Sequence, residues 1–328
     1  MVDTDGSAAE FQQHRARLLA LAYRLLGSAA EAEDAVQEAF LRWDAADRTA
    51  IAAPSAWLAK VVTNLCLNLL TSARARREHY VGPWLPEPVL TGAGTVLTAP
   101  LPAPGPEEHA ELRESLSLAV LMMLERLSPA ERAVFVLREA FGYGHREIAG
   151  VLDLSEAASR QHHRRARQRM EQPVRRFEAS QVRRRELLEG FLDAAAQGDL
   201  PGLEALLTED VTAWTDGGGH VSAARRPVLG RDRVARFVLG VVGQAAPDAV
   251  VATAEVNGEP GLVWWEAGGL RSVVALEMSG GGISGVRAVL NPEKLGYAAR
   301  QWRELQDSPE PSGSGELSHS RGLSGSSQ

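Results

Sequence analysis

The stretch Leu127–Met170 constrains this chain most, because it predicts two helical hairpins that end in an arginine-rich helix. Ser128-Pro129-Ala130-Glu131 has the pattern of a capping box with proline at the first helical position, so a helix begins there. Gly142-Tyr143-Gly144 ends that helix, and a second short helix is expected over His145–Leu152. Ser155 is placed to cap a third helix. The spacing therefore predicts a helix-turn-helix.

The third helix indicates what this motif binds. Its predicted packing face consists of Ser159, His163, Ala166 and Met170. The candidates for DNA contact are Ser155, Arg160, Gln161, Arg164, Arg165 and Arg167. Arginine offers a bidentate fork to guanine and to phosphate, and glutamine can bridge adenine. Glu156 and Glu171 are the only acidic residues between Ser155 and Gln172, which favours DNA contact over a solvated basic helix with i, i+4 partners.

Composition sets the broad class of protein. A chain of 328 residues predicts two or three domains, and 45% hydrophobic with 23% charged residues is typical of a globular protein. Residues 1–185 hold 24 Lys and Arg against 23 Asp and Glu, whereas residues 186–328 hold 11 against 19, so the acidity lies behind the helix-turn-helix. Cys66 is the only cysteine, which excludes an internal disulfide and a cysteine-built zinc site; we expect no metal and no cofactor. No apolar run matches a membrane span or a signal peptide, so a cytoplasmic location without membrane contact is expected.

Two helices are predicted in the first 45 or so residues of the chain. Residues 11–26 form the first, which Gly27 ends. Ser28-Ala29-Ala30-Glu31 caps the second, whose Val36, Phe40 and Trp43 share an apolar face. Asp34, Gln37 and Glu38 lie on its other faces, so one side packs and the other is free to meet a partner.

A long helix is expected from Ala56 to about Arg77. A polar stripe of Lys60, Asn64, Asn68 and Thr71 runs along it, and Arg74, Arg76 and Arg77 close it. Amide side chains can read an unpaired base edge while Lys and Arg hold phosphates. Cations also suit a helix C-terminus, so the three arginines have an equally good structural interpretation. Trp57 fits the core better than a base-stacking platform.

Residues 11 to about 177 resemble regions 2 and 4 of a sigma-70-family initiation factor of the extracytoplasmic-function group. The resemblance is carried by Tyr23–Ser28, Ala32–Trp43, Ala56–Leu58 with Val61–Leu67, and Ser128–Arg132. It implies that the helix with Asp34, Gln37 and Glu38 docks on the clamp helices of RNA polymerase core, and that the beta and beta-prime subunits of the core are the partners. It also implies that the face with Asn64 captures unstacked bases of the minus-ten element, and that the Ser155–Met170 helix enters the major groove of the minus-thirty-five element. Melting by selection among unstacked bases needs no catalytic residue.

His162 and His163 depart from the family pattern, since close relatives have aliphatic residues there; Ser159 departs too, at a place where a small apolar residue is usual. Packing of the third helix is therefore expected to be weaker or pH-sensitive. The base preference of this helix cannot be taken over from the family.

From Tyr80 the composition shifts toward an extended linker. Residues 91–106 are rich in Gly, Pro, Thr and Ala, which predicts a tether. Trp84 and Leu85 within Trp84-Leu85-Pro86-Glu87-Pro88 would each cost about 1.5 to 3 kcal/mol if exposed, so they are expected to dock on another surface. This motif resembles the one that marks the branch of these sigma factors with a fused C-terminal domain.

The remainder predicts an α+β domain with a curled antiparallel sheet. Expected elements are helices over 187–197, 200–207 and about 231–242, and strands over 211–215, 250–256, 261–267, 271–278 and 285–290. The pattern resembles a SnoaL-like domain of the NTF2-like superfamily, a cone with an internal pocket that leaves room for an unknown small-molecule ligand. Asp216-Gly217-Gly218-Gly219 and Asn291-Pro292-Glu293-Lys294 match two signatures of the fused branch. The resemblance implies that this domain replaces a separate anti-sigma factor.

Two functions compete for the C-terminal domain. Relatives of this fold include cyclases and isomerases, and Asp216 with His220 could serve as general base. Aspartate is also an ordinary first residue of a glycine-rich turn, and no second acid or base stands at a suitable spacing, so a non-catalytic role is favoured. A ligand-responsive helix-turn-helix regulator is the other alternative, but it leaves the two N-terminal helical surfaces without a purpose.

The sequence thus predicts a multidomain chain of two all-α sigma domains, a region 2 helical bundle and a region 4 helix-turn-helix, followed by an α+β SnoaL-like cone. The expected boundaries are 1–80 for region 2, 81–106 for the linker, 107–178 for region 4, 179–306 for the SnoaL-like domain and 307–328 for a disordered tail. The expected function is a sigma factor that brings RNA polymerase core to promoter DNA and is regulated in cis by its C-terminal domain.

Overall fold

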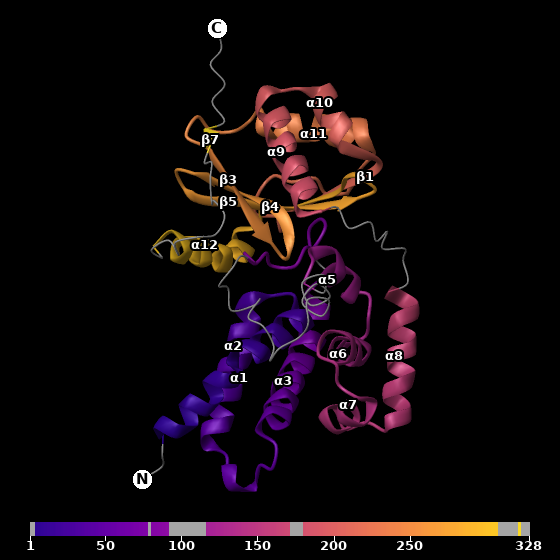
Figure 1. Cartoon of the computed structure of the whole chain (residues 1–328), viewed down its shortest axis with the longest axis vertical. Helices are drawn as coiled ribbons and strands as arrows, with labels where there is room; N and C mark the ends of the chain where they lie inside the picture. The colour runs from indigo at the N-terminus through magenta and orange to yellow at the C-terminus, as the bar shows by residue number, and fades with distance from the viewer. Residues whose placement is uncertain (1–3, 78–79, 92–115, 171–179, 308–320, 323–328) are drawn as a thin grey trace. The chain divides into compact units, whose positions relative to one another are not determined.

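The computed structural model of the chain describes residues 4–77, 80–91, 116–170, 180–307 and 321–322. These residues divide into two compact units, one comprising 1–79 with 93–172 and the other 80–92 with 173–328. Figure 1 traces the chain through the helical first unit and the mixed second unit. No helix of the described residues is long and apolar enough to cross a membrane.

The N-terminal half of the first unit is a bundle of three helices, α1 (Thr4–Leu26), α2 (Ala29–Ala45) and α3 (Pro54–Arg77), with a 3-10 turn η1 (Arg48–Ala50) before α3. Gly27, at φ +67°, ends α1, and the Ser28 hydroxyl accepts a hydrogen bond from the Glu31 amide to begin α2. Trp43 is fully buried, whereas Trp57 is half-buried with its ring centroid 5.7 Å from that of Trp43. Val36 and Trp43 of the apolar face predicted for α2 are buried, whereas Phe40 and the Trp57 expected in the core are only partly buried.

The second half of this unit holds α5 (Leu118–Leu124), α6 (Pro129–Phe135), a π-helical turn η3 (Val136–Ala140), α7 (His145–Leu152) and α8 (Glu156–Met170). The capping box predicted at Ser128 and Glu131 is confirmed, with both reciprocal hydrogen bonds present. The predicted bounds of α7 are confirmed as well. Residues 107–115, at the start of the predicted region 4 domain, lie outside the described part of the chain.

Two buried contacts join the halves of this unit. The Arg132 guanidinium donates to the Leu25 carbonyl at 2.8 Å, so it satisfies a carbonyl at the end of α1. Burial lowers the pKa of Arg132 to about 9. Phe141 is covered by arginines of α1, with the guanidinium carbons of Arg17 and Arg24 at 5.8 and 5.5 Å from its ring centroid.

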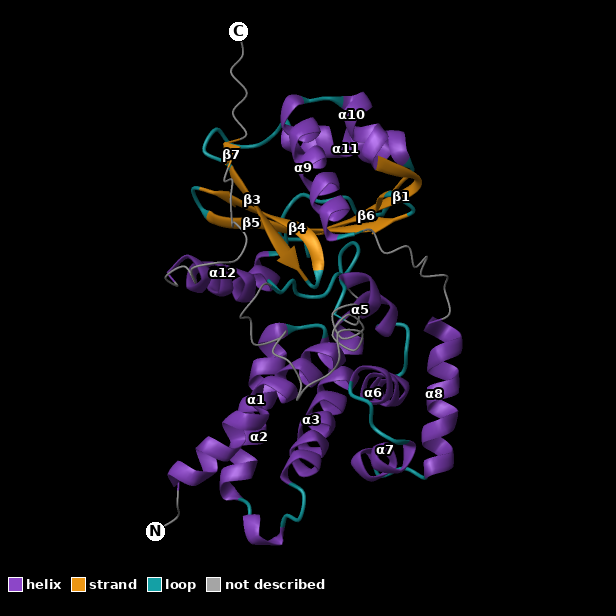
Figure 2. Ribbon diagram, in the orientation of Figure 1, coloured by secondary structure: helices purple, strands orange, loops and turns teal. Residues whose placement is uncertain are grey.

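The second unit is built on one seven-stranded sheet with the order β2-β1-β6-β5-β4-β3-β7. Its strands are β1 (Leu207–Asp216), β2 (Val228–Leu229), β3 (Val250–Val256), β4 (Glu259–Glu266), β5 (Gly269–Ser279), β6 (Gly282–Val289) and β7 (Arg321–Gly322). Its helices are α9 (Gln181–Gln197), α10 (Leu200–Leu206), α11 (Arg231–Val242) and α12 (Pro292–Asp307). Figure 2 shows α9, α10 and α11 on one face of the sheet and α12 on the other.

The expectation of an antiparallel sheet is wrong at one place. β1 pairs with β6 in parallel, with Trp214 opposite Arg287. Between these two strands the chain passes through α11 and the strands β3, β4 and β5, and β6 then lies beside β1. The other pairs are antiparallel. Because of this pairing, Asp216 at the end of β1 comes level with Val289 at the end of β6, which precedes Asn291 and α12. The motifs that begin at Asp216 and at Asn291 are far apart in the sequence, and they therefore meet at the same end of two neighbouring strands.

The ends of this domain also differ from the sequence-based expectations. Residues 80–91 belong to the C-terminal unit, where Leu90 forms an antiparallel bridge with Val256. Within the tail, which the sequence predicts to be disordered, Arg321 and Gly322 pair with β3 at Val251 and Val250. Strand β3 thus receives hydrogen bonds from the linker near one end and from the tail near the other.

Candidate nucleic-acid interface and linker-binding site

Helix α8 presents the predicted DNA-contacting side chains to solvent. Arg160, Gln161, Arg164, Arg165 and Arg167 are all exposed, while Ser159 and Ala166 are buried against the hairpin. The Ser155 hydroxyl accepts a hydrogen bond from the Ala158 amide at 3.1 Å and so begins the helix. Arg160 pairs with Glu156 at 2.6 Å, an exposed i, i+4 pair that costs little to break.

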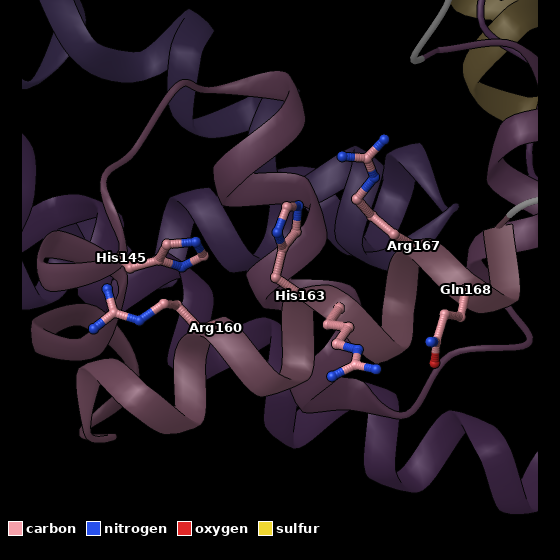
Figure 3. A pocket seen from close by; sticks show the side chains of 6 residues that line it. His145, Arg160, His163, Arg167 and Gln168 are labelled. Carbon is pink, nitrogen blue, oxygen red and sulfur yellow. The ribbon is translucent and has the colours of Figure 1, made fainter.

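A groove of about 580 Å³ lies between α7 and α8. Its walls are His145, Arg160, His163, Arg164, Arg167 and Gln168. Figure 3 shows His145 beside Arg160 at one end and Arg167 with Gln168 further along α8. Cationic and amide side chains that converge on an open groove suit the phosphates and base edges of DNA.

Two histidines fix α8 to the rest of the hairpin. His163 Nε2 lies 2.6 Å from a Glu139 carboxylate oxygen, and His145 Nδ1 lies 3.0 Å from the Ser159 hydroxyl. The rings of His145 and His163 are 5.4 Å apart. Burial lowers the pKa of His145, and the nearby Arg138, His163 and Arg160 lower it further, while Glu156 acts in the opposite direction. The sequence indicated that His163 was unusual but gave no partner for it, and it did not single out His145; the π-helical turn that carries Glu139 had no signal of its own.

The polar stripe of α3 is only partly exposed. Asn68 is exposed and Asn64 is half-buried. Lys60 Nζ donates to Asp153, the C-cap of α7, at 2.5 Å and to the carbonyl of Gly150 in the last turn of α7 at 3.1 Å. The Lys60 and Asp153 side chains are 37% and 73% exposed, and a pair this exposed contributes about 0 to 1 kcal/mol, so a phosphate could replace the carboxylate. The side chains of Arg74, Arg76 and Arg77 lie outside the described part of the structure.

The predicted polymerase-binding face of α2 is largely free. Asp34 and Gln37 are exposed, and Glu38 pairs with Arg42 at 2.9 Å on the same surface. Leu41 beside them is 55% exposed, which leaves an apolar side chain next to the acidic ones. Leu41 therefore offers exposed apolar area on this surface for a protein partner to bury.

In the C-terminal unit, Asp216 is the centre of a linker-binding site. Its side chain is 0% exposed. Oδ2 accepts hydrogen bonds from Lys294 Nζ at 2.7 Å and from the Leu85 amide at 2.8 Å. Oδ1 accepts from the Tyr80 hydroxyl at 2.5 Å and from the Gly218 amide at 3.0 Å. Both oxygens of this carboxylate are therefore occupied, and two of the four donors belong to the linker.

Lys294 completes the contact with the linker. Its ammonium donates to the Leu85 carbonyl at 2.6 Å and lies 4.3 Å from the ring centroid of Trp84 and 4.7 Å from that of Tyr80. Burial and the hydrogen bond to Asp216 raise the pKa of Tyr80, although its hydrogen bond from Asn291 acts in the opposite direction.

The remaining motif residues support this site. The Asn291 amide donates to the Tyr80 hydroxyl at 2.9 Å, and a Cβ at Gly218 (φ +58°) would lie 2.3 Å from the same amide nitrogen. Gly218 is therefore required by both its backbone conformation and its neighbour. Leu85, Pro86 and Pro88 are buried, and Trp84, Glu87 and Gly217 are partly or fully buried. Pro292 and Glu293 begin α12, with the Glu293 amide donating to Asn291 Oδ1 at 3.1 Å.

Three contacts of the linker had no signal in the sequence. Gln301 of α12 accepts from the Leu90 amide at 2.9 Å and donates to the Leu90 carbonyl at 3.1 Å, so a side chain supplies the pairing that a neighbouring strand would give. Asn257 accepts from the Val89 amide at 3.0 Å. The Thr91 hydroxyl accepts from the Gly258 amide at 2.6 Å. These residues pair with the linker across more than 160 positions of sequence, where local patterns carry no information.

The alternative of an acid–base site is not supported by this geometry. Asp216 is separated from solvent by the linker, and His220 pairs with Glu293 at 3.5 Å on the exposed surface. In the ranges that the structure covers, no group of three or more His, Cys, Asp or Glu side chains could hold a metal ion.

Comparison with known proteins identifies the family. Residues 11–76 match Sigma-70 region 2, and residues 117–170 match Sigma-70 region 4. The chain is 40% identical over 308 residues to the ECF RNA polymerase sigma factor SigJ of Mycobacterium tuberculosis, covering 90% of this chain and 96% of that protein. The crystal structure of Mycobacterium tuberculosis SigJ superposes with a TM-score of 0.68 at 36% identity, covering 88% of this chain and 98% of that one. The chain therefore belongs to the extracytoplasmic-function group of sigma-70-family RNA polymerase sigma factors.

Proposed function

We propose that this sigma factor brings RNA polymerase core to a subset of promoters through three surfaces and is regulated in cis by its C-terminal domain. Helix α2, with Asp34, Gln37 and Glu38, is the polymerase-binding surface toward the beta and beta-prime subunits. Helix α3, through Asn64 and its neighbours, contacts the minus-ten element, and α8 reads the minus-thirty-five element. The protein acts in the cytoplasm, where RNA polymerase is.

The exposure of the α8 side chains supports the DNA assignment. Arg164, Arg165 and Arg167 stand on the solvent face, while the opposite face of the same helix packs on the hairpin. Free guanidinium groups along one face can pair with phosphate or guanine without first giving up a buried contact. Arg160 gives up only its exposed pair with Glu156.

The linker-binding site carries the proposal of regulation in cis. The chain that joins region 2 to region 4 donates to Asp216 through the Tyr80 hydroxyl and the Leu85 amide. A domain that holds this segment limits how far regions 2 and 4 can separate, and a promoter requires a fixed separation. A covalently attached domain acts at a high effective concentration, so it needs no separate anti-sigma protein. Whether a small-molecule ligand enters this domain stays a prediction.

Run-off transcription with core polymerase and genomic fragments tests the function. The chain should confer start-site selection, and Asn64→Ala and Arg160→Ala should weaken it, because each removes a group that contacts one promoter element. Arg271→Ala, which changes an arginine paired with Glu266 in the C-terminal domain, is the matched control and should leave selection intact. Selection that survives both Asn64→Ala and Arg160→Ala would refute the assignment of α3 and α8.

Deletion of residues from Glu186 onward tests regulation. The deletion removes Asp216 and Lys294, so the linker loses its binding site and promoter-dependent output should change. Asp216→Asn in the full chain should change output in the same direction, whereas Glu189→Gln, which changes an exposed carboxylate of α9 in the same domain, should not. Unchanged output from both the deletion and Asp216→Asn would dispose of regulation in cis while leaving the sigma function standing.

The enzyme alternative has a direct test too. A cyclase or isomerase that uses Asp216 needs this carboxylate to meet substrate. The linker and Lys294 fill that position, which supports a non-catalytic role. Substrate turnover by the full chain that Asp216→Asn abolishes would reverse this conclusion.

A further inference from the structure

The C-terminal domain contains one strongly basic segment within an otherwise acidic sequence. Residues 225–236, here called the basic segment, hold five of the 11 Lys and Arg found in residues 186–328 and only one of the 19 Asp and Glu. The rest of the domain is therefore strongly negative. Such segregation of charge is not needed for folding or solubility, which an even mixture would serve as well.

Three arginines of the basic segment are free to bind a ligand. Arg225, Arg226 and Arg233 are exposed. Among the residues that the structure covers, none of the three guanidinium groups has a hydrogen bond or an ion pair. The other two have structural roles: Arg231 Nε donates to the Leu207 carbonyl at 3.0 Å, and Arg236 pairs with Asp232 at 2.7 Å.

The fold holds these arginines on a rigid base. Strand β2, two residues after Arg226, pairs with β1 through Thr212 with Leu229 and Ala213 with Val228. Helix α11 then carries Arg233 outward, since Val234 and Ala235 are buried in the core of the domain. The basic segment therefore presents its charges from regular elements at the β2 edge of the sheet.

The linker ties the basic segment to the end of α3. A Cβ at Gly82 would lie 3.8 Å from the Arg225 Cα, so the linker passes against the segment. Four residues of chain, 78–81, lie between Gly82 and Arg77, the last residue of α3. The five Cα-to-Cα steps from Arg77 to Gly82 span at most about 18 Å. The basic segment is thus kept within reach of any DNA held at that end of α3.

We infer that the basic segment binds the phosphate backbone of duplex DNA, through Arg225, Arg226 and Arg233, next to the position where α3 holds promoter DNA. The position next to α3 rests on the proposed function, whereas phosphate binding by these arginines does not. Arginine forks fit phosphate oxygens, and release of counterions from the duplex supplies the free energy. The alternative ligand of the basic segment is an acidic protein surface, and the test below distinguishes it from DNA.

The electrostatic contribution sets the expected effect. Each phosphate contact contributes about 0.9 to the slope of log K against log salt concentration. Arg225→Ala with Arg226→Ala should therefore lower the slope by about 2 units. If the affinities extrapolate to the same value at 1 M salt, this corresponds to a loss of roughly 60-fold at 0.1 M.

The test uses the full-length chain and a fluorescently labelled duplex of mixed sequence, about 40 base pairs long, in an anisotropy titration at several salt concentrations. The matched control is Arg300→Ala with Arg303→Ala, which removes two exposed charges from α12 of the same domain. We expect the slope to fall in the first double variant and to stay as in the unchanged chain in the control.

Three results would overturn the inference: equal slopes for the chain and the Arg225/Arg226 double variant, equal losses in variant and control, or no binding of duplex by the unchanged chain at low salt. Weakened binding of the double variant to core polymerase alone, with unchanged duplex binding, would assign the basic segment to a protein partner instead. Failure of start-site selection in the run-off assay is a separate outcome, because it concerns the proposed function and not the mixed-sequence duplex.

Discussion

Substitution of Asp216 by asparagine is the perturbation that the structure predicts most sharply. The carboxylate is completely buried and accepts four hydrogen bonds, one of them from the Lys294 ammonium at 2.7 Å. Asparagine keeps the size of the side chain but removes its charge. It also places an NH2 group where an oxygen accepted hydrogen bonds, so donor would face donor.

The magnitude follows from two costs. Breaking a buried ion pair by changing one partner leaves the other charge uncompensated, which costs about 3 to 5 kcal/mol. Leaving a buried donor such as the Leu85 amide without its acceptor costs about 1 to 3 kcal/mol. The two costs share one site and are not independent, so we expect the free energy of unfolding of the C-terminal domain to fall by about 4 kcal/mol. Domains of this size are stable by about 5 to 15 kcal/mol, so the change is large enough to measure.

Urea unfolding of the full chain, followed by tryptophan fluorescence, measures this change. Five of the seven tryptophans lie in the C-terminal unit, and Trp84 is in contact with Lys294, so the signal reports mainly on this unit. Lys294→Met and the double variant complete a cycle with Asp216→Asn. The double variant should lose less than the sum of the single ones, because it leaves no unpaired charge.

Glu293→Gln is the control, since its carboxylate is exposed and pairs only with His220. It should unfold like the unchanged chain. A loss below about 1 kcal/mol in Asp216→Asn would refute the reasoning, because exposed pairs have values in that range. Additive losses in the cycle would refute it too, since they would mean that Asp216 and Lys294 do not interact.

Three further predictions concern the linker and the hairpin. Leu85→Ala removes a fully buried side chain and should cost about 2 to 5 kcal/mol, seen as faster proteolysis within residues 80–91; cleavage at the original rate would contradict the burial. Gln301→Leu leaves the backbone amide and carbonyl of Leu90 without the Gln301 side chain and should speed amide exchange at Leu90. Gln301→Glu should keep the hydrogen bond from the Leu90 amide and exchange more slowly. Equal exchange in the two variants would contradict a role of Gln301 in holding Leu90. The pKa of His145 is below its ordinary 6.5, so the folded hairpin binds this proton less readily than the unfolded chain, and its stability should decrease as pH falls below about 6.5. Between about pH 7.5 and pH 5.5, the Tm of the His145→Gln variant should therefore change less than the Tm of the unchanged chain. Identical changes in Tm would exclude His145 as the cause of the pH dependence.

Local sequence signals determined the helical part of this protein. Ser128 with Glu131, Ser28 and Gly27 act within one helical turn, because capping hydrogen bonds join residues three or four positions apart. The predicted bounds of α7 and the buried face of α8 follow from the same short range, and two motifs in the correct order sufficed to identify the family.

Only the tertiary structure decided which distant residues meet. The parallel pairing of β1 with β6 brings Asp216 to Lys294, and the linker pairs with Gln301, Asn257 and Asp216. Glu139, which lies in a π-helical turn, contacts His163, and Lys60 contacts Asp153. Such contacts depend on chain topology, and their energies appear only when both sides are assembled. No pattern within a few residues encodes them, which is why the sequence predicted the parts of this molecule and the fold determined their pairing.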